Sequence, residues 1–145
     1  MTTDERSLHS VSVGAAVVGE GNRLLAIRRR DNGAWQLPGG ILERDEGPLQ
    51  AVRREVLEET AVLVEPGPLT GVYKNMALGV VSLVFRCHII GGEPRPTEEA
   101  TQVAWLTLEE IAHRMVEAFA IRLQDAVTAE PTPQVRLHDG TNLIV

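Results

Sequence analysis

The alternation of aliphatic, β-branched and polar residues predicts that the chain begins with strands. Residues 10–18 (SVSVGAAVV) and 23–28 (RLLAIR) are rich in residue types that favour strands. The short segment between them contains two glycines, which suit a turn. We therefore expect residues 10–28 to form a hairpin.

A second region with strand patterns lies in the middle of the chain. Prolines at both ends of residues 66–68 mark a loop, and residues 69–90 predict two strands with a turn or bulge near residues 77–79. Residues 91–99 (GGEPRPTEE) have the composition of a loop. Residues 101–106 (TQVAWL) then predict one more strand.

Apolar residues at helical spacing predict a helix between these two regions. Leu49, Val52 and Val56 recur at positions i, i+3 and i+7, which places them on one face of a helix. Pro48 is suited to the first helical position, and Gly47 is a permissible cap before it. This helix should pack its apolar face against the sheet.

A second helical region lies near the C-terminal end. Thr107 begins a capping box, TLEE, and residues 115–127 carry an apolar stripe. We expect this region to cover the other face of the sheet. The order of strands, helix, strands and helices therefore predicts an α/β fold with a sheet between helices.

The polar face of the first predicted helix carries a dense group of charges, which includes Arg54. At about 100° per residue, Glu55, Glu58 and Glu59 gather within one turn. Like charges at this spacing oppose helix formation, so a cation is the expected partner. Carboxylates without His or Cys suit Mg²⁺ or Mn²⁺, and Mg²⁺ commonly also binds substrate phosphates. For an isolated acidic helix, the alternative is a solvated face with one Arg–Glu pair.

Residues 40–62 resemble the box of the Nudix hydrolase family, G-x5-E-x7-R-E-U-x-E-E-x-G-U, in which U is a bulky aliphatic residue. The matching positions are Gly40, Glu46, Arg54, Glu55, Val56, Glu58, Glu59 and Val62. Ala61 stands at the family's glycine, and Asp45 stands where many members have glycine. Neither departure removes a carboxylate, and the preceding LPGG segment strengthens the resemblance.

The resemblance implies a Nudix α/β/α sandwich with a mixed β-sheet between helices, and an enzyme that uses Mg²⁺ or Mn²⁺. In many members, an acid six residues before a strand tryptophan binds another metal or activates water; Trp105 places this acid at Glu99, with Glu98 as the rival. The implied metal ligands are the carbonyl of Gly39 and the carboxylates of Glu55, Glu58, Glu59 and Glu99. The implied catalytic residues are Glu55, Glu58, Glu99 and Arg54, in which Arg54 orients an acid and Glu55 or Glu99 accepts the proton of water.

Basic residues near the box are candidates for binding substrate phosphates. Arg28, Arg29 and Arg30 end the second predicted strand, just before the loop that leads to the box. Alternation would place Arg28 and Arg30 on one face, so we expect these two to bind substrate, although the face itself stays open. Lys74 is a further candidate for a phosphate contact, and Tyr73 could pack on a base. Solvation is the alternative for each of these residues.

The implied reaction is attack of water on phosphorus within a diphosphate linkage, in a nucleoside triphosphate or in another nucleoside diphosphate linked to a second group. Residues 76–81 lack the proline that marks many ADP-ribose enzymes, and the markers of the NADH and coenzyme A subgroups are also absent. An ADP-ribose or nucleotide-sugar pyrophosphatase is the main alternative. A non-catalytic ligand-sensing module is less favoured, because all the box acids remain: Glu46, Glu55, Glu58 and Glu59.

Length and composition predict one domain over residues 1–145, with residues 1–8 and 128–145 as less ordered tails and a small hairpin or partner contact left open in the second. A net charge of −6 argues against binding of nucleic acid polymers, so we expect a small-molecule nucleotide as partner. The N-terminus has no secretory apolar core and no stretch has the length of a membrane span, so we expect a cytoplasmic protein without membrane contact. Cys87, the single cysteine, should be a buried, inert thiol. Family members are often homodimers, but no segment specifies an interface.

Overall fold

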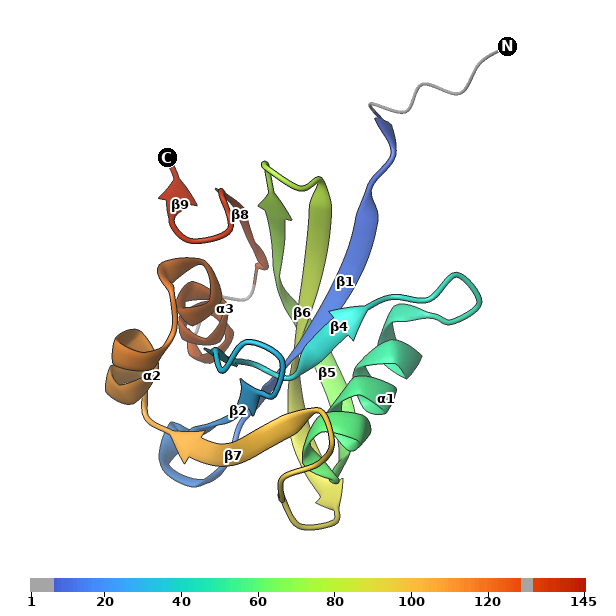
Figure 1. The fold of residues 1–145 in the computed structure, drawn as a ribbon, viewed down its shortest axis with the longest axis vertical. Coiled ribbons are helices and arrows are strands. Elements are labelled where there is room, and N and C mark those ends of the chain that lie inside the picture. Colours follow the sequence, from blue (N-terminus) through green and yellow to red (C-terminus); the bar gives the residue numbers. More distant parts are fainter. Residues whose placement is uncertain (1–6, 129–131) are drawn as a thin grey trace.

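The computed structural model describes residues 7–128 and 132–145, which form an α/β fold (Figure 1). The strands are β1 (Ser10–Val17), β2 (Leu24–Arg29), β3 (Trp35–Gln36), β4 (Gly39–Ile41), β5 (Leu63–Asn75), β6 (Val80–Gly91), β7 (Ala100–Leu106), β8 (Gln134–His138) and β9 (Leu143–Ile144). The α-helices are α1 (Pro48–Thr60), α2 (Leu108–Arg114) and α3 (Glu117–Val127), and Glu20–Asn22 is a short 3-10 helix. The helix α1 lies on one side of the central sheet, and α2 and α3 lie on the other.

The strands form two sheets, and β1 lies inside the larger one. β1 is parallel to β6 and antiparallel to β4, in a six-stranded sheet with the order β4-β1-β6-β5-β8-β9. β5 is antiparallel to β6 and parallel to β8. The remaining strands form a three-stranded sheet with the order β3-β2-β7. The predicted mixed sheet between helices is therefore confirmed.

Alternation along β1 explains why both faces of the sheet are covered. Val13 and Val17 point to one face and pack in a core cluster with Val52 of α1. Ala16 points to the opposite face and belongs to a second core cluster with Leu123 of α3. Because successive side chains of a strand point to opposite faces, one apolar strand supplies both cores.

The expected hairpin of residues 10–28 is wrong, although both of its strands form. β1 and β2 lie in different sheets and share a single bridge, between Val18 and Leu24. Both edges of β1 are already paired, with β4 and β6, so β2 pairs with β3 and β7 instead. The connection also packs closely on the smaller sheet, since a Cβ at Gly19 would lie 2.7 Å from the ring of Trp105.

The N-terminal end of α1 matches the sequence prediction. Gly47 is the cap residue, and Pro48 is the first residue of the helix. Ala61 ends the helix in the left-handed conformation, with a φ of 66°, and its N–H donates to the carbonyl of Leu57 at 3.0 Å. The turn that usually favours glycine therefore forms here with alanine.

Two smaller expectations are wrong. Leu49 is 43% exposed, because the buried face of α1 is centred on residues such as Ala51 and Val56 rather than on Leu49. The prolines of residues 66–68 lie within β5 and not in a loop. The pairing of β5 with β6 shifts register at this segment, which accommodates residues that cannot donate a backbone hydrogen bond.

The C-terminal segment, expected as a less ordered tail, adds β8 and β9 to the large sheet as a small hairpin. Arg136 of β8 donates two hydrogen bonds to the carboxylate of Asp125 in α3, at 2.7 and 2.8 Å. The same carboxylate accepts a hydrogen bond from the hydroxyl of Tyr73 in β5, at 2.7 Å. These contacts join the end of the chain to α3 and β5. Residues 1–6, which belong to the other expected tail, lie outside the described residues.

The predicted capping box at α2 is confirmed. The Thr107 hydroxyl accepts from the N–H of Glu110 at 3.2 Å, and the Glu110 carboxylate accepts from the N–H of Thr107 at 3.0 Å.

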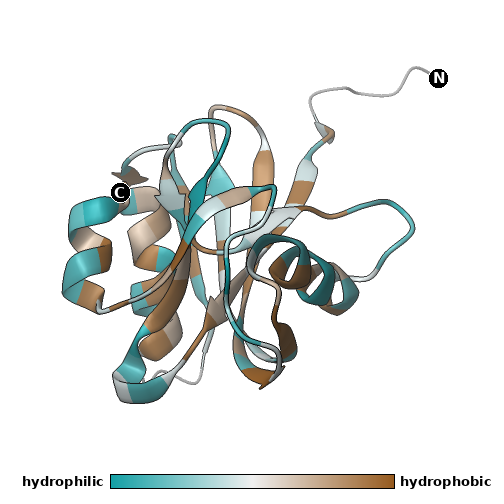
Figure 2. Cartoon of the chain, turned by 60° about the horizontal axis from the view of Figure 1, so that its bottom comes forward, coloured by the Kyte–Doolittle hydropathy of each residue, from teal (hydrophilic) through white to brown (hydrophobic). Residues whose placement is uncertain are grey.

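The loop between β4 and α1 is hydrophilic and extends away from the sheet (Figure 2). Within the described ranges, no helix has the length and apolar content needed to cross a membrane.

Candidate active site

Three carboxylates meet between α1 and the loop that precedes β7. Glu55 and Glu59 are one helical turn apart on α1 and are only 8% and 6% exposed. Glu99, at the end of the loop, is exposed. One carboxylate oxygen from each of the three residues lies within 4.8 Å of the others. The acid cluster Glu55–Glu59–Glu99 therefore joins two parts of the chain that are distant in sequence.

Two adjacent glycines of β4 allow this cluster to form. The N–H of Gly39 donates to Oε1 of Glu59 at 2.7 Å. A Cβ at Gly39 would lie 2.2 Å from the carbonyl oxygen of Val13 in β1. A Cβ at Gly40 would lie 2.6 Å from the carboxylate of Glu55. The first glycine is thus needed for close strand pairing, and the second leaves room for an acid of the cluster.

Burial makes the acids of the cluster costly in the absence of a cation. Burial raises the pKa of Glu59 to about 8; the Gly39 N–H opposes this shift, and nearby Glu55 and Glu99 add to it. The pKa of Glu55 is also raised, mainly by burial. A divalent cation would compensate this concentrated negative charge, and a set of carboxylate oxygens is the donor type that Mg²⁺ and Mn²⁺ prefer. The residues present therefore fit such a metal.

Arg54 connects the cluster to the first acid of the box. Its guanidinium donates to Glu46 at 2.6 and 3.0 Å and to Oε1 of Glu55 at 2.9 Å. These charge-assisted hydrogen bonds raise the pKa of Arg54 and lower the pKa of Glu46. Arg54 thereby pairs with the neighbouring acids as the sequence predicts, and holds one oxygen of Glu55. Its orienting role in the reaction stays a prediction.

Two of the expected metal ligands, Glu58 and the Gly39 carbonyl, are not part of the acid cluster. The Glu58 side chain is 43% exposed, and its Oε2 lies 3.4 Å from Nη1 of Arg54. The carboxylates that meet are instead those of Glu55, Glu59 and Glu99. Gly39 lies beside them and contacts Glu59 through its N–H. Metal binding by Glu58 and by the Gly39 carbonyl stays a prediction.

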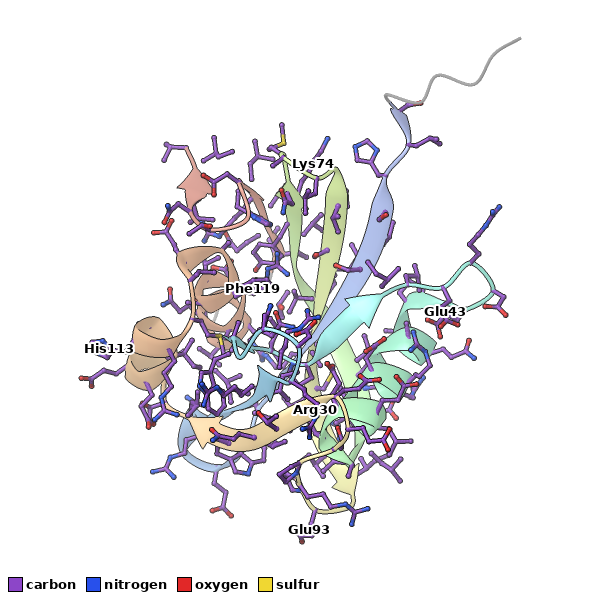
Figure 3. The ribbon with its side chains drawn as sticks, in the orientation of Figure 1. Arg30, Glu43, Lys74, Glu93, His113 and Phe119 are labelled. Carbon is purple, nitrogen blue, oxygen red and sulfur yellow. The ribbon has the colours of Figure 1, made fainter. Side chains whose placement is uncertain are left out.

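The acid cluster opens into a pocket of about 800 Å³. The pocket extends from α1 and β4 across β1 and β6 to α3 and the segment after β8. Its lining includes Gly39, Gly40, Glu55, Glu59, Glu98 and Glu99 on the acid side, Arg29, Arg30 and Asp31 at the end of β2 and just after it, and Phe119, Arg122, His138 and Gly140 on the α3 side. Figure 3 shows Arg30 beside the loop that precedes β7 and Phe119 on α3.

The structure separates the three consecutive arginines. Arg30 lines the pocket and donates to the carbonyls of Glu98 at 2.7 Å and Thr97 at 3.2 Å, so it fixes the loop that carries Glu99. Arg29 also lines the pocket, although alternation predicts that it faces away from Arg30. Arg28 does not line it, because its guanidinium donates to the carbonyl of Gly33 at 3.0 Å. A shift in register between Arg28 and Arg29 breaks the alternation.

The expected roles of Lys74 and Tyr73 do not fit the geometry. Lys74 is absent from the lining of the pocket and lies near the turn between β5 and β6 (Figure 3). Tyr73 lies on the opposite face of β5 from Lys74, is fully buried, and donates to Asp125. Ser82 of β6, which is paired with Tyr73 and therefore faces the same side of the sheet, lines the pocket. Successive residues of a strand face opposite sides, so Lys74 points away from the pocket.

Arg122 and His138 are pocket residues that the sequence prediction missed. Arg122 is 6% exposed and His138 is 2% exposed, and Nη2 of Arg122 lies 3.0 Å from Nε2 of His138. One signal for Arg122 was available, because it stands between Ile121 and Leu123 in the apolar stripe of residues 115–127. No local pattern marks His138, whose position depends on the pairing of β8 with β5.

A family model described as NUDIX domain matches residues 8–126. The chain belongs to the Nudix family. A MutT-like protein from Streptomyces ambofaciens is 58% identical to it over 137 residues, which cover 94% of this chain and 88% of the relative. An ADP-ribose pyrophosphatase from Methanocaldococcus jannaschii is 32% identical over 111 residues, 72% of this chain and 66% of the relative.

Solved structures agree with this Nudix assignment. The MutT Nudix hydrolase from Burkholderia pseudomallei superposes with a TM-score of 0.74 at 31% identity. The match covers 84% of this chain and the whole of the Burkholderia chain. A Nudix hydrolase from Nitrosomonas europaea has a TM-score of 0.76 at 26% identity, with 89% of this chain and 77% of its own covered. The family, the fold and the expectation of an enzyme that acts on phosphoric anhydride bonds are confirmed. Nudix hydrolases generally use divalent metals, which agrees with the acid cluster.

Proposed function

We propose that this Nudix hydrolase cleaves a diphosphate linkage in a nucleoside triphosphate, or in another nucleoside diphosphate linked to a second group, with Mg²⁺ or Mn²⁺. The observation that carries the proposal is the acid cluster Glu55–Glu59–Glu99, in which Glu55 and Glu59 are buried, at one side of a pocket of about 800 Å³. A pocket of that size accommodates a small molecule of nucleotide size. Arg29, which is paired with Asp31, and Arg30, whose guanidinium donates to backbone carbonyls, line the same pocket and are the candidate cations for phosphates.

Glu55, Glu59 and Glu99 would hold the metal, with the Gly39 carbonyl and Glu58 as further predicted ligands. A cation held there would neutralise phosphate charge and polarise a phosphoryl oxygen. Glu55 or Glu99 accepts a proton from the water that attacks phosphorus, the bridging P–O bond breaks, and the second phosphate leaves with the bridging oxygen and its electron pair. Burial raises the pKa of Glu55, and Arg54 holds one of its oxygens. Arg30 keeps the loop of Glu99 in place.

Two substrate classes have support from relatives. The MutT-like relative and a protein named putative 8-oxo-dGTP diphosphatase 2 from Mycobacterium tuberculosis, 33% identical over 112 residues, favour a nucleoside triphosphate. The relative named ADP-ribose pyrophosphatase favours the alternative, ADP-ribose or a nucleotide sugar. A non-catalytic sensing module is the least favoured, because no box carboxylate is lost. A single-domain cytoplasmic protein with a small-molecule nucleotide as its partner completes the proposal.

A hydrolysis screen with Mg²⁺ and with Mn²⁺ tests this function. The panel contains nucleoside triphosphates, ADP-ribose, dinucleoside polyphosphates and nucleotide sugars. We expect turnover of at least one class, and we expect Glu55→Gln to lower kcat at least about 100-fold, because the variant loses both a metal ligand and a proton acceptor. Glu43→Gln is the matched control, since Glu43 is exposed and outside the cluster.

Either of two results would contradict the proposal. The first is full turnover by Glu55→Gln under conditions where the protein is folded. The second is a folded protein that binds Mn²⁺ and hydrolyses nothing in the panel, a result that favours the sensing module.

A further inference from the structure

Arg122 of α3 is a buried cation that faces the pocket. It is 6% exposed, and its guanidinium lies 5.2 Å from the ring centre of Tyr73 and 4.8 Å from that of Phe119. Its Nε donates to the carbonyl of Ala118 at 3.0 Å, and its Nη2 contacts Nε2 of His138. A guanidinium in so enclosed a position needs a compensating group.

The described residues supply no carboxylate for Arg122. Asp125, on the same helix, is occupied by Arg136 and Tyr73. Burial lowers the pKa of Arg122 to about 10, because the charged guanidinium loses its hydration. Nη1 makes no hydrogen bond with the described residues, yet every fully buried side-chain nitrogen among them has a partner. Nη1 is therefore not fully buried, and it is the nitrogen of Arg122 that is left to contact a ligand in the pocket.

His138 cannot accept a hydrogen bond from both of the donors that face it. The Nη2 of Arg122, which can only donate, lies 3.0 Å from Nε2 of His138, and the N–H of Gly140 points at Nδ1 from 3.0 Å. A neutral imidazole accepts at one ring nitrogen only. Protonation would leave no acceptor at all, and burial and the charge of Arg122 both lower the pKa of His138. One of the two donors is therefore left without an acceptor.

These donors lie on the α3 side of the pocket, whereas the acid cluster comes from α1 and the loop before β7. Arg122, His138, Gly140 and Phe119 all line the pocket. A substrate whose diphosphate lies at the acid cluster would extend its remaining part toward them. The unsatisfied groups are donors, so the part that they contact must present acceptors.

We propose that Arg122, with His138 and Gly140, determines specificity by binding a hydrogen-bond acceptor on the part of the substrate beyond the cleaved diphosphate. The inference rests on the proposed function and extends it. The acceptor has two sources: the keto oxygen and ring nitrogen of an oxopurine base, which match the fork of a guanidinium, or a carboxylate on the second group. The ring of Phe119 offers an apolar surface for a planar group on the same side.

The experiment compares pairs of substrates in which one member offers a keto oxygen or a carboxylate that the other lacks. Inosine triphosphate and adenosine triphosphate differ by a keto oxygen in place of an amino group, and UDP-glucuronate and UDP-glucose differ by a carboxylate. We expect the protein to prefer the acceptor-bearing member of one pair by about tenfold or more in kcat/KM, mainly through KM. Arg122→Gln abolishes that preference, and the loss appears as a higher KM for the acceptor-bearing member.

The controls separate a binding role from a structural one. Arg86→Gln removes another arginine that donates to a carbonyl of α3, that of Ala126, but Arg86 does not line the pocket, so the preference should persist. Arg122→Lys keeps the charge without the fork and should keep only the preference for a carboxylate. If Arg122→Gln does not fold, as judged by thermal unfolding, Arg122→Lys alone decides between the keto and carboxylate sources.

Equilibrium binding gives a readout without turnover. Inosine and adenosine monophosphates, and the 1-phosphates of glucuronate and glucose, contain no diphosphate linkage to cleave. A preference for the acceptor-bearing ligand that Arg122→Gln removes supports the inference even if the protein hydrolyses nothing, in which case the proposed function fails alone. Equal affinity within both pairs, or a preference that survives both Arg122 variants, overturns the inference.

Discussion

At the residue scale, Gly40 contributes to the acid cluster because it has no side chain and so leaves room for the carboxylate of Glu55. A Cβ there would lie 2.6 Å from the carboxylate of Glu55, which is a side chain and can move away. We expect Gly40→Ala to lower kcat by about tenfold to a hundredfold, because it displaces a predicted metal ligand. Steady-state kinetics and a thermal unfolding curve measure the two effects, and the unfolding midpoint should change little.

Gly39→Ala is the informative control for this prediction. Its Cβ would meet the backbone oxygen of Val13 at 2.2 Å, so β4 must separate from β1. Its unfolding midpoint should therefore fall far more than that of Gly40→Ala. Similar midpoints for the two variants would show that the contact with Glu55 is not what Gly40 provides.

Cys87 gives a pH-dependent prediction. Burial raises the pKa of its thiol from 9.0 to about 12, and the thiolate is the reactive form. The folded protein should resist alkylation by iodoacetamide at pH 9, while the denatured chain reacts, as mass spectrometry can measure. Because the folded state holds the proton more tightly, ionisation opposes folding, and stability is lost as pH rises from 9.0 toward 12. Full labelling of the folded protein at pH 9 would contradict the burial.

The sequence identifies the acids of the site better than its cations. Helical period alone places Glu55 and Glu59 together, and the family resemblance places Glu99. Arg28 is absent from the lining of the pocket, and the register shift next to it, which no local pattern marks, interrupts the alternation on which its prediction rested. Arg122 escapes prediction because its partners come from β8 and the turn after it, which only the tertiary fold brings to α3.

At the scale of elements, the C-terminal end of α1 carries removable strain. Ala61 adopts a φ of 66°, a conformation in which a Cβ is unfavourable. We expect Ala61→Gly to raise the free energy of unfolding by about 1 kcal/mol in denaturant titrations, with unchanged activity. Ala51→Gly, the same exchange in the buried interior of α1, should lower it by at least about 1 kcal/mol. A loss of stability in both variants would argue against strain at Ala61.

Local patterns predict where strands and helices form but not which strands pair. The segments 10–18 and 23–28 both form strands, yet β2 joins a different sheet because both edges of β1 are occupied. The opposite failure affects residues 66–68, whose prolines predict a loop but are accommodated within β5 by register shifts. Pairing depends on long-range partners, and a single segment carries no information about them.

At the scale of the whole molecule, the Arg136–Asp125 pair links the C-terminal hairpin to the rest of the fold. The Asp125 carboxylate is 6% exposed and would be left buried without its cation in Arg136→Met. We expect this variant to lose about 2 kcal/mol of unfolding free energy, measured in urea. Lys74→Met is the control, because Lys74 lies in the neighbouring strand and makes no ion pair with any described residue. Equal stability of both variants would show that the pair contributes little.

The pairing of β1 with β6 also bears on how the chain is synthesised. β1 and β6 are parallel neighbours, and their paired residues, such as Ser12 and Ser82, are 70 positions apart. At about 5–20 residues per second, a ribosome adds those residues in about 4–14 s. For that period β1, whose residues are mostly valine and alanine, has left the ribosome without its longest partner. Nascent chains that end before residue 80 therefore expose an apolar strand edge to chaperones and to other nascent chains.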